Sequence, residues 1–450
     1  MKKSGNIYRL LFAALVCFAA TMTTTSCRFE EDDYFDESAS LRVEHAIDSV
    51  RTILTTAENG WVMQYFCGTG VKHFEGFNLF ARFTEGGKVT LAGNHRMLRN
   101  GNAGKYTEAA SLYSLLLEDG PVLAFNTWND VLTPFVDPVS PWAAPNTLVK
   151  DGEGMKGDNN FVIMSYSNDQ IIMRGERYQA EVRLTKCPSS WADYIADTDK
   201  MKNYITNTSV TNYYVTDNEG DTLYFQGLRG GAFRYCESLS NAVKVDSLMC
   251  VFTPEGFRVS STAKLGDNSF HEFTLSEDST CLYSEDNKVK VEACWDNYVV
   301  SHTDVWDFDV EKFSAEQKSL YDQLDEELKV YNKNCSLANI GIGKSSGSGA
   351  VLGLVVTFYT NTAKTKTNTM GLTLDMSRPA YGLLRIVSTP EDAADRNMTS
   401  IASRAENILP IVRSFAATLN GVYEVTPNSY FLPTGGDFKA ISGGTTFKLD

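Results

Sequence analysis

A short stretch between residues 296 and 309 combines carboxylates, a histidine and aromatic side chains. Its members are Asp296, Asn297, Tyr298, His302, Asp304, Trp306, Asp307 and Asp309. Glycoside hydrolysis uses two carboxylates at a set separation, and sugar rings pack on tryptophan and tyrosine. Acidic loops between secondary-structure elements are also common, and the stretch fits that simpler description. A carboxylate-dependent hydrolase therefore stays open as an alternative, with Trp306 as a candidate binding residue.

A second aromatic group, Tyr113, Trp128 and Trp142, lies in or beside a proline-rich, loop-like stretch. Aromatic side chains on loops make contacts with glycans and with proteins. Packing beneath the loop is the commoner fate of such residues. We name Trp128, Trp142 and Trp306 as the candidate binding residues.

Motifs for metal, phosphate or nucleophilic chemistry are missing from the sequence. The five histidines are scattered and form no H-E-x-x-H, and neither G-x-S-x-G nor a G-x-x-x-x-G-K-[ST] phosphate loop is present. Asp217, Glu219 and Asp221 alternate as in some calcium loops, but Leu228 stands where the bidentate glutamate belongs. A hairpin turn is the better interpretation of that segment. We expect no metal site and no cofactor, and a non-catalytic role is favoured.

Cys27 ends a segment typical of a lipoprotein leader. Basic residues at the start are followed by an apolar run over 10–20 and small polar residues over 23–26. This order marks a secretory signal, and the apolar run is too short to span a bilayer. We predict cleavage before Cys27 and diacylation of its thiol, which would anchor the chain to a lipid bilayer. The acidic residues 30–33 that follow belong to a solvated tether.

Composition limits the partners and the disulfides. The 450 residues carry a formal net charge of −15, which disfavours nucleic acid as a partner. The chain is long enough for two or three globular units. Beyond the leader and Cys27 the sequence has seven cysteines, an odd number that requires at least one thiol outside any disulfide. Cys236 and Cys294 lie on the polar faces of alternating strands and could pair; the sequence leaves the pattern open.

Hydrophobic periodicity predicts mostly strands, with a few helices. Residues 41–57 carry an i, i+3/i+4 apolar stripe, and a second helix begins at Ser314, where S-A-E-Q forms a capping box. The alternating strands favour an α+β fold of mainly antiparallel sheets with helices packed on one face. We divide the chain into a signal peptide (1–26), a lipidated acidic tether (27–39), an N-terminal α+β domain (40–205), a hairpin-rich β region (206–312) and a C-terminal α+β domain (313–450). Residues 40–92 and 314–375 share an order of elements, which suggests a possible internal duplication.

Four segments resemble a family of Bacteroidota lipoproteins known as domain of unknown function 4302. They are SLRVEHAIDSVRTILTTAENGW, FNLFARFTEGGKVTLAG, FNTWNDVLTPFVDP and GDNNFVIMSYSNDQIIMRGERY. The resemblance is strongest over about residues 27–190, and its motifs are structural, not catalytic. It implies a lipid-anchored protein of the outer membrane that faces the cell exterior, in the company of nutrient-uptake systems.

Three classes of function remain open on this basis. The leading one is a non-catalytic surface lipoprotein that binds a glycan, a peptide or a partner in an uptake complex. The second is a hydrolase that uses the carboxylates over 296–309. The third is a structural or adhesive envelope protein without a small-molecule site.

Overall fold

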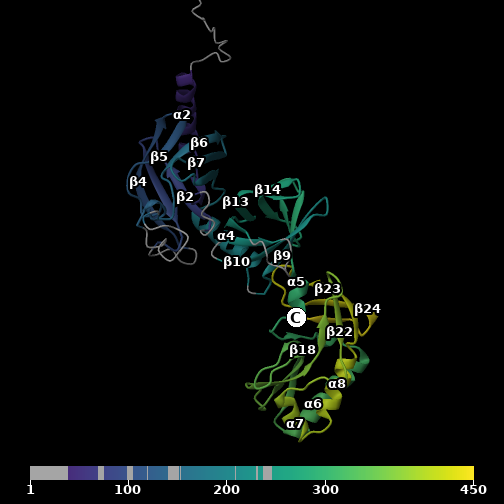
Figure 1. The fold of residues 1–450 in the computed structure, drawn as a ribbon. Helices are drawn as coiled ribbons and strands as arrows, with labels where there is room; N and C mark the ends of the chain where they lie inside the picture. Colours follow the sequence, from purple (N-terminus) through teal and green to yellow (C-terminus); the bar gives the residue numbers. More distant parts are fainter. Residues whose placement is uncertain are drawn as a thin grey trace, which may run out of the picture.

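The computed structural model describes residues 39–68, 75–98, 105–118, 120–139, 152, 154–207, 209–229, 232–236 and 246–450. Two β-barrels and a C-terminal unit follow one another along the chain (Figure 1). Cys27 and Trp142 lie outside the described residues.

The first barrel consists of eight antiparallel strands in sequence order. Its elements are α2 (Ala39–Thr55), β1 (Trp61–Phe66), β2 (Phe77–Phe83), β3 (Lys88–Gly93), β4 (Thr107–Leu117), β5 (Pro121–Phe125), α3 (Thr133–Val136), β6 (Asn160–Tyr166), β7 (Gln170–Gly175) and β8 (Glu181–Lys186). Each strand pairs with the next, and β8 pairs with β1 from Trp61 opposite Lys186 to Phe66 opposite Glu181. The pairing of β8 with β1 closes the sheet, so the barrel has no open edge.

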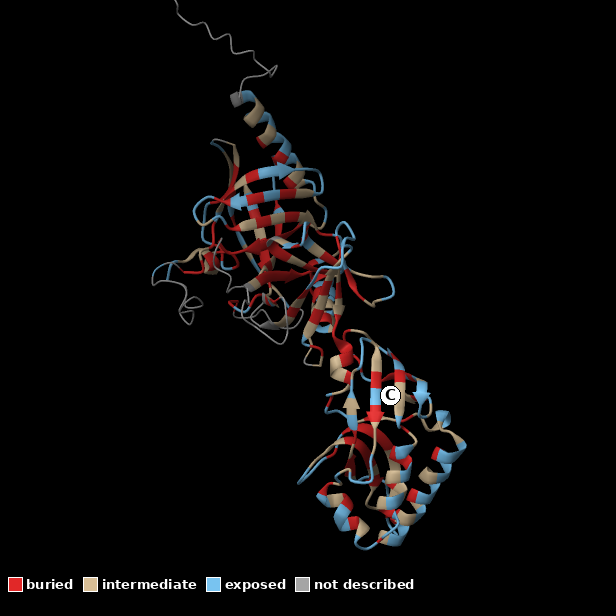
Figure 2. Cartoon of the chain, turned by 45° about the vertical axis from the view of Figure 1, so that its right-hand side comes forward, coloured by how far each residue is buried: buried red, intermediate tan, exposed pale blue. Residues whose placement is uncertain are grey.

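Alternation along the strands fills the barrel with the sheet's own side chains. Trp61, Met63 and Tyr65 of β1 belong to the inner core, together with residues of all the other strands. Val62, which lies between Trp61 and Met63, points to the other side of the strand. There it packs in a separate cluster with Trp191. Eight strands enclose a space that side chains can just fill. Figure 2 shows the result as buried residues along the barrel strands.

The second barrel repeats this plan. Its elements are α4 (Trp191–Ile205), β9 (Asn212–Asp217), β10 (Thr222–Arg229), β11 (Ala232–Cys236), β12 (Asp246–Phe252), β13 (Gly256–Leu265), β14 (Asn268–Leu275), β15 (Leu282–Ser284), β16 (Val289–Ala293) and α5 (Trp295–Val299). The strands again pair in sequence order, and β16 closes on β9.

The same hydrogen bond joins helix and first strand in both barrels. The indole Nε1 of Trp61 donates to the carbonyl of Leu54 at 3.0 Å, and the Tyr213 hydroxyl donates to the carbonyl of Ile205. The last carbonyls of a helix have no partner inside the helix, so an aromatic donor on the next strand fixes the angle between the two elements. The chain thus contains one helix-plus-barrel unit twice.

The C-terminal unit holds two antiparallel sheets and three α-helices. Its elements are β17 (Trp306–Asp307), η1 (Val310–Lys312), α6 (Ala315–Tyr331), β18 (Ser336–Lys344), β19 (Leu352–Tyr359), β20 (Thr367–Thr373), β21 (Asp375–Ser377), β22 (Leu383–Val387), α7 (Arg396–Ala402), α8 (Ile408–Ala417), β23 (Gly421–Pro427), β24 (Gly436–Gly443) and β25 (Phe447–Leu449). The sheets have the orders β17-β18-β19-β20 and β21-β22-β23-β24-β25. Backbone bonds of 2.9 Å in both directions between Asp307 and Asp450 tie the chain end to β17. One apolar core continues from the second barrel into this unit.

The predicted fold class is wrong in its architecture, although the antiparallel pairing is confirmed. We expected open sheets with helices packed on one face; the first two sheets instead close into barrels. A closed sheet buries its inner face against itself and needs no helix to cover it. The predicted duplication also fails, because 40–92 lies in a closed barrel and 314–375 contributes α6 and three strands of a four-stranded sheet. The unit that repeats is the barrel.

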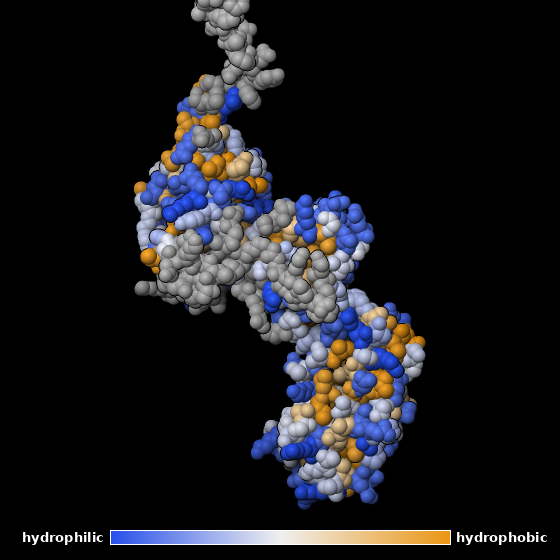
Figure 3. Space-filling view, in the orientation of Figure 1, coloured by the Kyte–Doolittle hydropathy of each residue, from blue (hydrophilic) through white to orange (hydrophobic). Residues whose placement is uncertain are grey.

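The seven described cysteines are all buried, and none of them forms a disulfide. This includes Cys236 and Cys294, whose pairing the sequence left open. Burial raises the pKa of the Cys294 thiol to about 12, so it stays protonated at neutral pH. None of the described helices is long and apolar enough to cross a bilayer. Hydrophilic residues, with apolar groups between them, make up much of the visible surface (Figure 3).

Candidate functional site

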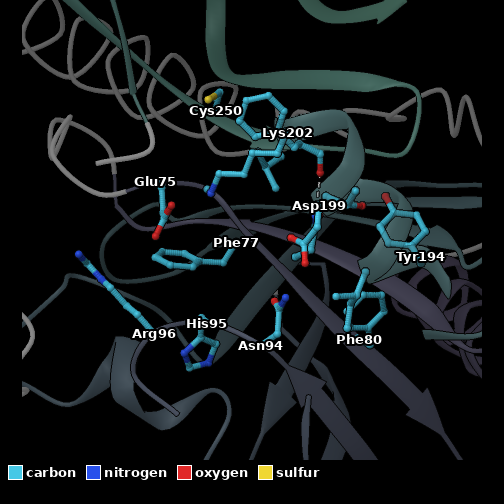
Figure 4. A pocket seen from close by; sticks show the side chains of 16 residues that line it. Glu75, Phe77, Phe80, Asn94, His95, Arg96, Tyr194, Asp199, Lys202 and Cys250 are labelled. Carbon is cyan, nitrogen blue, oxygen red and sulfur yellow. Dashed lines mark hydrogen bonds between the residues drawn. The ribbon is translucent and has the colours of Figure 1, made fainter. Parts of the chain in front are cut away.

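A pocket of about 340 Å³ lies where the two barrels meet (Figure 4). Residues from the start of β2, the loop after β3, helix α4 and strand β12 line it. Its volume is within the range of about 300–1,000 Å³ that small-ligand sites occupy. This pocket is the candidate site, and several of its lining residues are polar.

Asn78 connects the pocket to the second barrel. On β2 its neighbour Phe77 points into the core of the first barrel, so alternation turns Asn78 outward. The amide Nδ2 of Asn78 donates to the Phe252 carbonyl at 2.7 Å, and the Gly76 N–H donates to the Cys250 carbonyl at 3.0 Å. The amide oxygen Oδ1 is buried and has no hydrogen-bond partner in the part of the chain that the structure describes. It is therefore an unused acceptor at the pocket.

His95 presents a second unused acceptor. Its Nε2 lies 2.9 Å from the Val131 carbonyl, and because a carbonyl only accepts, Nε2 must carry the proton. The ring packs edge-on against Phe77 and Phe135. Burial lowers the pKa of His95 to about 4, so the ring is neutral at pH 7. Nδ1 then has a lone pair, and none of the described residues donates to it.

Helix α4 contributes the opposite wall. Tyr194, Ile195, Thr198, Asp199 and Lys202 all line the pocket and follow an i, i+3/i+4 spacing that puts them on one helix face. Thr198 is 9% exposed, and its hydroxyl forms no hydrogen bond with another described residue. A hydroxyl both donates and accepts, so Thr198 adds a donor to a pocket whose other two unpartnered atoms are acceptors.

These unpartnered atoms gather at one place. Six buried side-chain atoms among the described residues lack a partner, and three of them line this pocket: Asn78 Oδ1, His95 Nδ1 and Thr198 Oγ1. Buried polar groups in folded proteins are nearly always hydrogen-bonded, and leaving one unpaired costs about 1–3 kcal/mol. Three of the six belong to residues that line this pocket, which makes it the candidate site.

Charged side chains surround the unpartnered atoms. Glu75, Arg96, Asp199 and Lys202 line the same pocket. In the close-up view the Lys202 side chain extends from α4 toward Glu75, with Arg96 on the far side of Glu75 (Figure 4). Burial raises the pKa of Asp199, against the opposing effect of Lys202. The two carboxylates add acceptors to the pocket and the two cations add donors at its edge.

The candidate residues from the sequence lie elsewhere. Trp128, in the loop after β5, is 68% exposed, and its Nε1 donates to Asp130 at 2.7 Å. Trp306, on β17, is 3% exposed and stacks on His302 with 3.8 Å between ring centroids, so it offers no open ring face. Tyr113 is buried in the core of the first barrel. The structure does not bring Trp128 and Trp306 together, and ligand contact at Trp128, Trp142 or Trp306 stays a prediction.

The acidic stretch 296–309 is occupied by structural contacts. Asp296 is 3% exposed and forms an ion pair of 2.9 Å with Arg378. Asp309 accepts from the Glu311 N–H at the start of η1, and His302 Nδ1 lies 2.7 Å from the Asp304 carbonyl.

The hairpin interpretation of Asp217 is confirmed, because its carboxylate accepts from the N–H groups of Glu219 and Asp221 in the turn between β9 and β10. Across the described residues, no three His, Cys, Asp or Glu side chains are grouped so as to hold a metal ion.

The sequence of α4 contains one signal for the pocket. The inward stripe of α4 runs Trp191, Tyr194, Ile195 and then Thr198, a hydroxyl where an apolar residue is expected. A polar residue on an apolar helix stripe marks a buried polar group that needs a partner. Asn78 and His95 carry no comparable local signal, because their positions depend on how the two barrels meet.

Protonation of His95 predicts a pH-dependent stability. The folded pKa of about 4 is below the ordinary 6.5, so the unfolded chain binds more protons between these values. The free energy of unfolding therefore falls as the pH drops from 6.5 to 4, by about 3 kcal/mol in total. In His95→Gln, whose amide can still donate to Val131, this loss should disappear, whereas in His271→Gln, at an exposed position, it should persist. Urea titrations over this pH range test it, and identical pH profiles for His95→Gln and the unmodified chain would contradict it.

A family model identifies the family of this chain, whereas comparisons with curated proteins and solved structures do not. Comparison with curated proteins gave no match. Among solved structures, an uncharacterized protein from Bacteroides eggerthii DSM 20697 matches with 13% identity over 28% of this chain and 96% of that chain, with a TM-score of 0.17. The family model of the domain of unknown function DUF4302 matches residues 31–277, more than half of the chain, and this range includes every residue of the inter-barrel pocket. The chain therefore belongs to the DUF4302 family.

Proposed function

We propose that this chain is a non-catalytic, lipid-anchored cell-surface protein that binds a small ligand rich in hydrogen-bond donors between its two barrels. The observation that carries the proposal is that Asn78, His95 and Thr198 all line one pocket, and each has a buried polar atom without a partner among the described residues. A role in nutrient uptake at the outer membrane is part of the proposal and rests on the family resemblance.

The donor and acceptor pattern favours a saccharide. Asn78 Oδ1 and His95 Nδ1 can only accept, and the carboxylates of Glu75 and Asp199 also accept. A ligand that satisfies them must bring several O–H or N–H groups. Sugars carry many hydroxyl donors together with apolar C–H faces, and the pocket has apolar lining residues such as Ile195 and Val251 beside its polar ones.

Lipidation of Cys27 predicts how the chain partitions between a detergent phase and water. A diacylated chain partitions with membranes because each buried CH₂ contributes about 0.8 kcal/mol. We expect the unmodified chain to enter the detergent phase of a phase-separating extract and Cys27→Ser to stay in the aqueous phase. Cys335→Ser, at a buried cysteine, is the matched control and should partition like the unmodified chain. A Cys27→Ser chain found entirely in the detergent phase would refute lipidation at this residue.

Thermal stability in the presence of a ligand panel tests the binding role. The panel should contain neutral mono- and oligosaccharides, peptides and haem, each added to the purified full chain. A ligand at 100 times its Kd adds about 2.7 kcal/mol to the stability of the native state, enough to raise Tm by a degree or more. We expect saccharides to raise Tm and the other classes to leave it unchanged. A saccharide that is instead hydrolysed would favour the hydrolase alternative, and a panel with no effect at all would contradict ligand binding.

A further inference from the structure

A second pocket, of about 330 Å³, lies where the second barrel meets the C-terminal unit. Tyr214, Thr216 and Glu292 line it from β9 and β16, and Arg378 and Tyr381 line it from the connection between β21 and β22. It shares no lining residue with the inter-barrel pocket. The two pockets are therefore separate sites on the molecule.

Arg378 is held rigidly by one side of its guanidinium group. Its Nη1 donates to Asp296 Oδ2 at 2.9 Å and to the Tyr214 hydroxyl at 2.7 Å. Asp296 is buried, and its carboxylate raises the pKa of Arg378, which keeps the guanidinium charged. A fixed, charged arginine loses little conformational entropy when a ligand binds to it.

The other edge of the same guanidinium is available. Nε and Nη2 of Arg378 form no hydrogen bond with any described residue, and the side chain is 30% exposed. These two nitrogens lie in one plane with parallel N–H directions, the geometry that matches the two oxygens of a carboxylate. Arg378 therefore keeps a bidentate donor edge beyond its structural contacts.

Tyr381 forms an aromatic wall beside this edge. The residue is 45% exposed, yet its hydroxyl accepts from Trp295 Nε1 at 3.0 Å. The ring also contacts Tyr214 edge-on, with 5.6 Å between centroids. Tyr381 is thus an exposed aromatic residue fixed at its hydroxyl and against the rings of Tyr214 and Trp295, and the C–H face of a sugar packs on such residues.

Glu292, a carboxylate that lines this pocket, forms an ion pair with a neighbouring lysine. Glu292 forms an ion pair of 3.0 Å with Lys290, as Asp296 does with Arg378. The protein carboxylates at the pocket are thus neutralised by neighbours. An incoming carboxylate therefore meets no unpaired negative charge among these residues.

We propose that Arg378 and Tyr381 form a second binding site, for a carboxylate-bearing sugar. The Nε and Nη2 edge of Arg378 binds the carboxylate, and the Tyr381 ring packs against the apolar face of the sugar ring. The Thr216 hydroxyl supplies a further hydrogen bond at the same pocket. This site is independent of the one proposed between the barrels.

Calorimetric titration of the full chain in detergent tests the site with a matched pair of probes. Galacturonate disaccharide carries the carboxylate, and the corresponding galactose disaccharide lacks it. We expect the acidic disaccharide to bind at least 10-fold more tightly than the neutral one. Equal affinities, or no binding of the acidic probe, would overturn the proposal.

Three variants locate the binding and control for folding. Arg378→Lys keeps a cation beside Asp296 but removes the bidentate edge, and Tyr381→Ala removes the aromatic wall; each should weaken binding of the acidic probe at least 10-fold. Arg385→Lys, at an exposed position on β22, is the matched control and should bind normally. Circular dichroism confirms that each variant is folded. Unchanged affinity in folded Arg378→Lys and Tyr381→Ala would show that the probe binds elsewhere and would overturn the assignment.

Discussion

Replacing Asp158 with alanine is expected to lower the free energy of unfolding by about 4 kcal/mol. Asp158 is 4% exposed, and its carboxylate accepts four backbone hydrogen bonds of 2.9–3.1 Å from Arg177, Tyr178 and Ala180. These residues form the turn from β7 to β8, and β8 is the strand that closes the first barrel on β1. Without the carboxylate, the buried Ala180 N–H and the half-buried N–H groups of Arg177 and Tyr178 lose this partner, and the closing strand loses its support.

Urea unfolding followed by circular dichroism measures this effect. Asp158→Asn keeps one acceptor oxygen and should lose about half as much stability. Asp169→Ala is the matched control, since that side chain is 84% exposed and forms only a surface ion pair with Lys186. Equal losses for Asp158→Ala and Asp169→Ala would contradict the structural role of Asp158.

Replacing Arg258 with methionine is the second change with a large expected effect. Arg258 lies between the barrels: Nη1 donates to Gln64 Oε1 at 3.3 Å, and the guanidinium lies 5.5 Å from the centroid of the Phe66 ring. Burial and the neighbouring Arg183 lower the pKa of Arg258 to about 10, so it stays charged at pH 7. Removing one member of such a partly buried charge network typically costs about 3 kcal/mol.

The loss in Arg258→Met should grow as the pH rises. Burial raises the pKa of Glu181 above its ordinary value, and Arg258 is the first of the cations that oppose this rise. Without Arg258 the folded pKa of Glu181 rises further above that of the unfolded chain, so the folded state is favoured at low pH and loses stability as the pH rises through the folded pKa. Urea titrations at pH 5 and pH 8 test the sign. Arg385→Met, at an exposed site, is the control, and a loss that shrinks toward pH 8 would contradict the account.

Local elements were predictable because local signals encode them. The predicted capping box at Ser314 is present, with the Ser314 hydroxyl accepting from the Gln317 N–H and the Gln317 side chain accepting from the Ser314 N–H. The stripe over 41–57 corresponds to α2, which ends at Thr55. The strands WVMQYF and FNLFARF are β1 and β2. Caps and periodicity involve residues a few positions apart, so a single sequence is enough to read them.

Barrel closure was not predictable in the same way. It depends on pairing between Trp61 and Lys186, far apart in the chain, and alternation within a strand is the same for an open and a closed sheet. A weak signal does exist. Each barrel is followed by a cysteine and then a helix that begins W-x-x-Y, with Cys187 and Trp191 after the first and Cys294 and Trp295 after the second. Comparing these two segments would have indicated two equivalent units.

The inter-barrel pocket was equally hidden. Asn78, His95 and Thr198 come from β2, the loop after β3 and α4, and no motif links them. They meet because β2 contacts β12 through the Asn78 and Gly76 hydrogen bonds across the barrel junction. The aromatic residues that drew attention in the sequence, Trp128 and Trp306, are easy to notice because of their size, whereas an unpartnered polar atom is visible only in three dimensions.

Calorimetric titration gives the most direct test of the account. The saccharide that raises Tm most is titrated into the unmodified full chain and into two threonine variants. Thr198→Val preserves the shape of the side chain and removes only the unpartnered hydroxyl, so the fold should remain stable. We predict that it weakens binding at least 10-fold, equivalent to about 1.4 kcal/mol, while Thr52→Val, at an exposed position on α2, binds like the unmodified chain. Equal affinity in Thr198→Val and the unmodified chain would contradict the assignment of the pocket between the barrels as the ligand site.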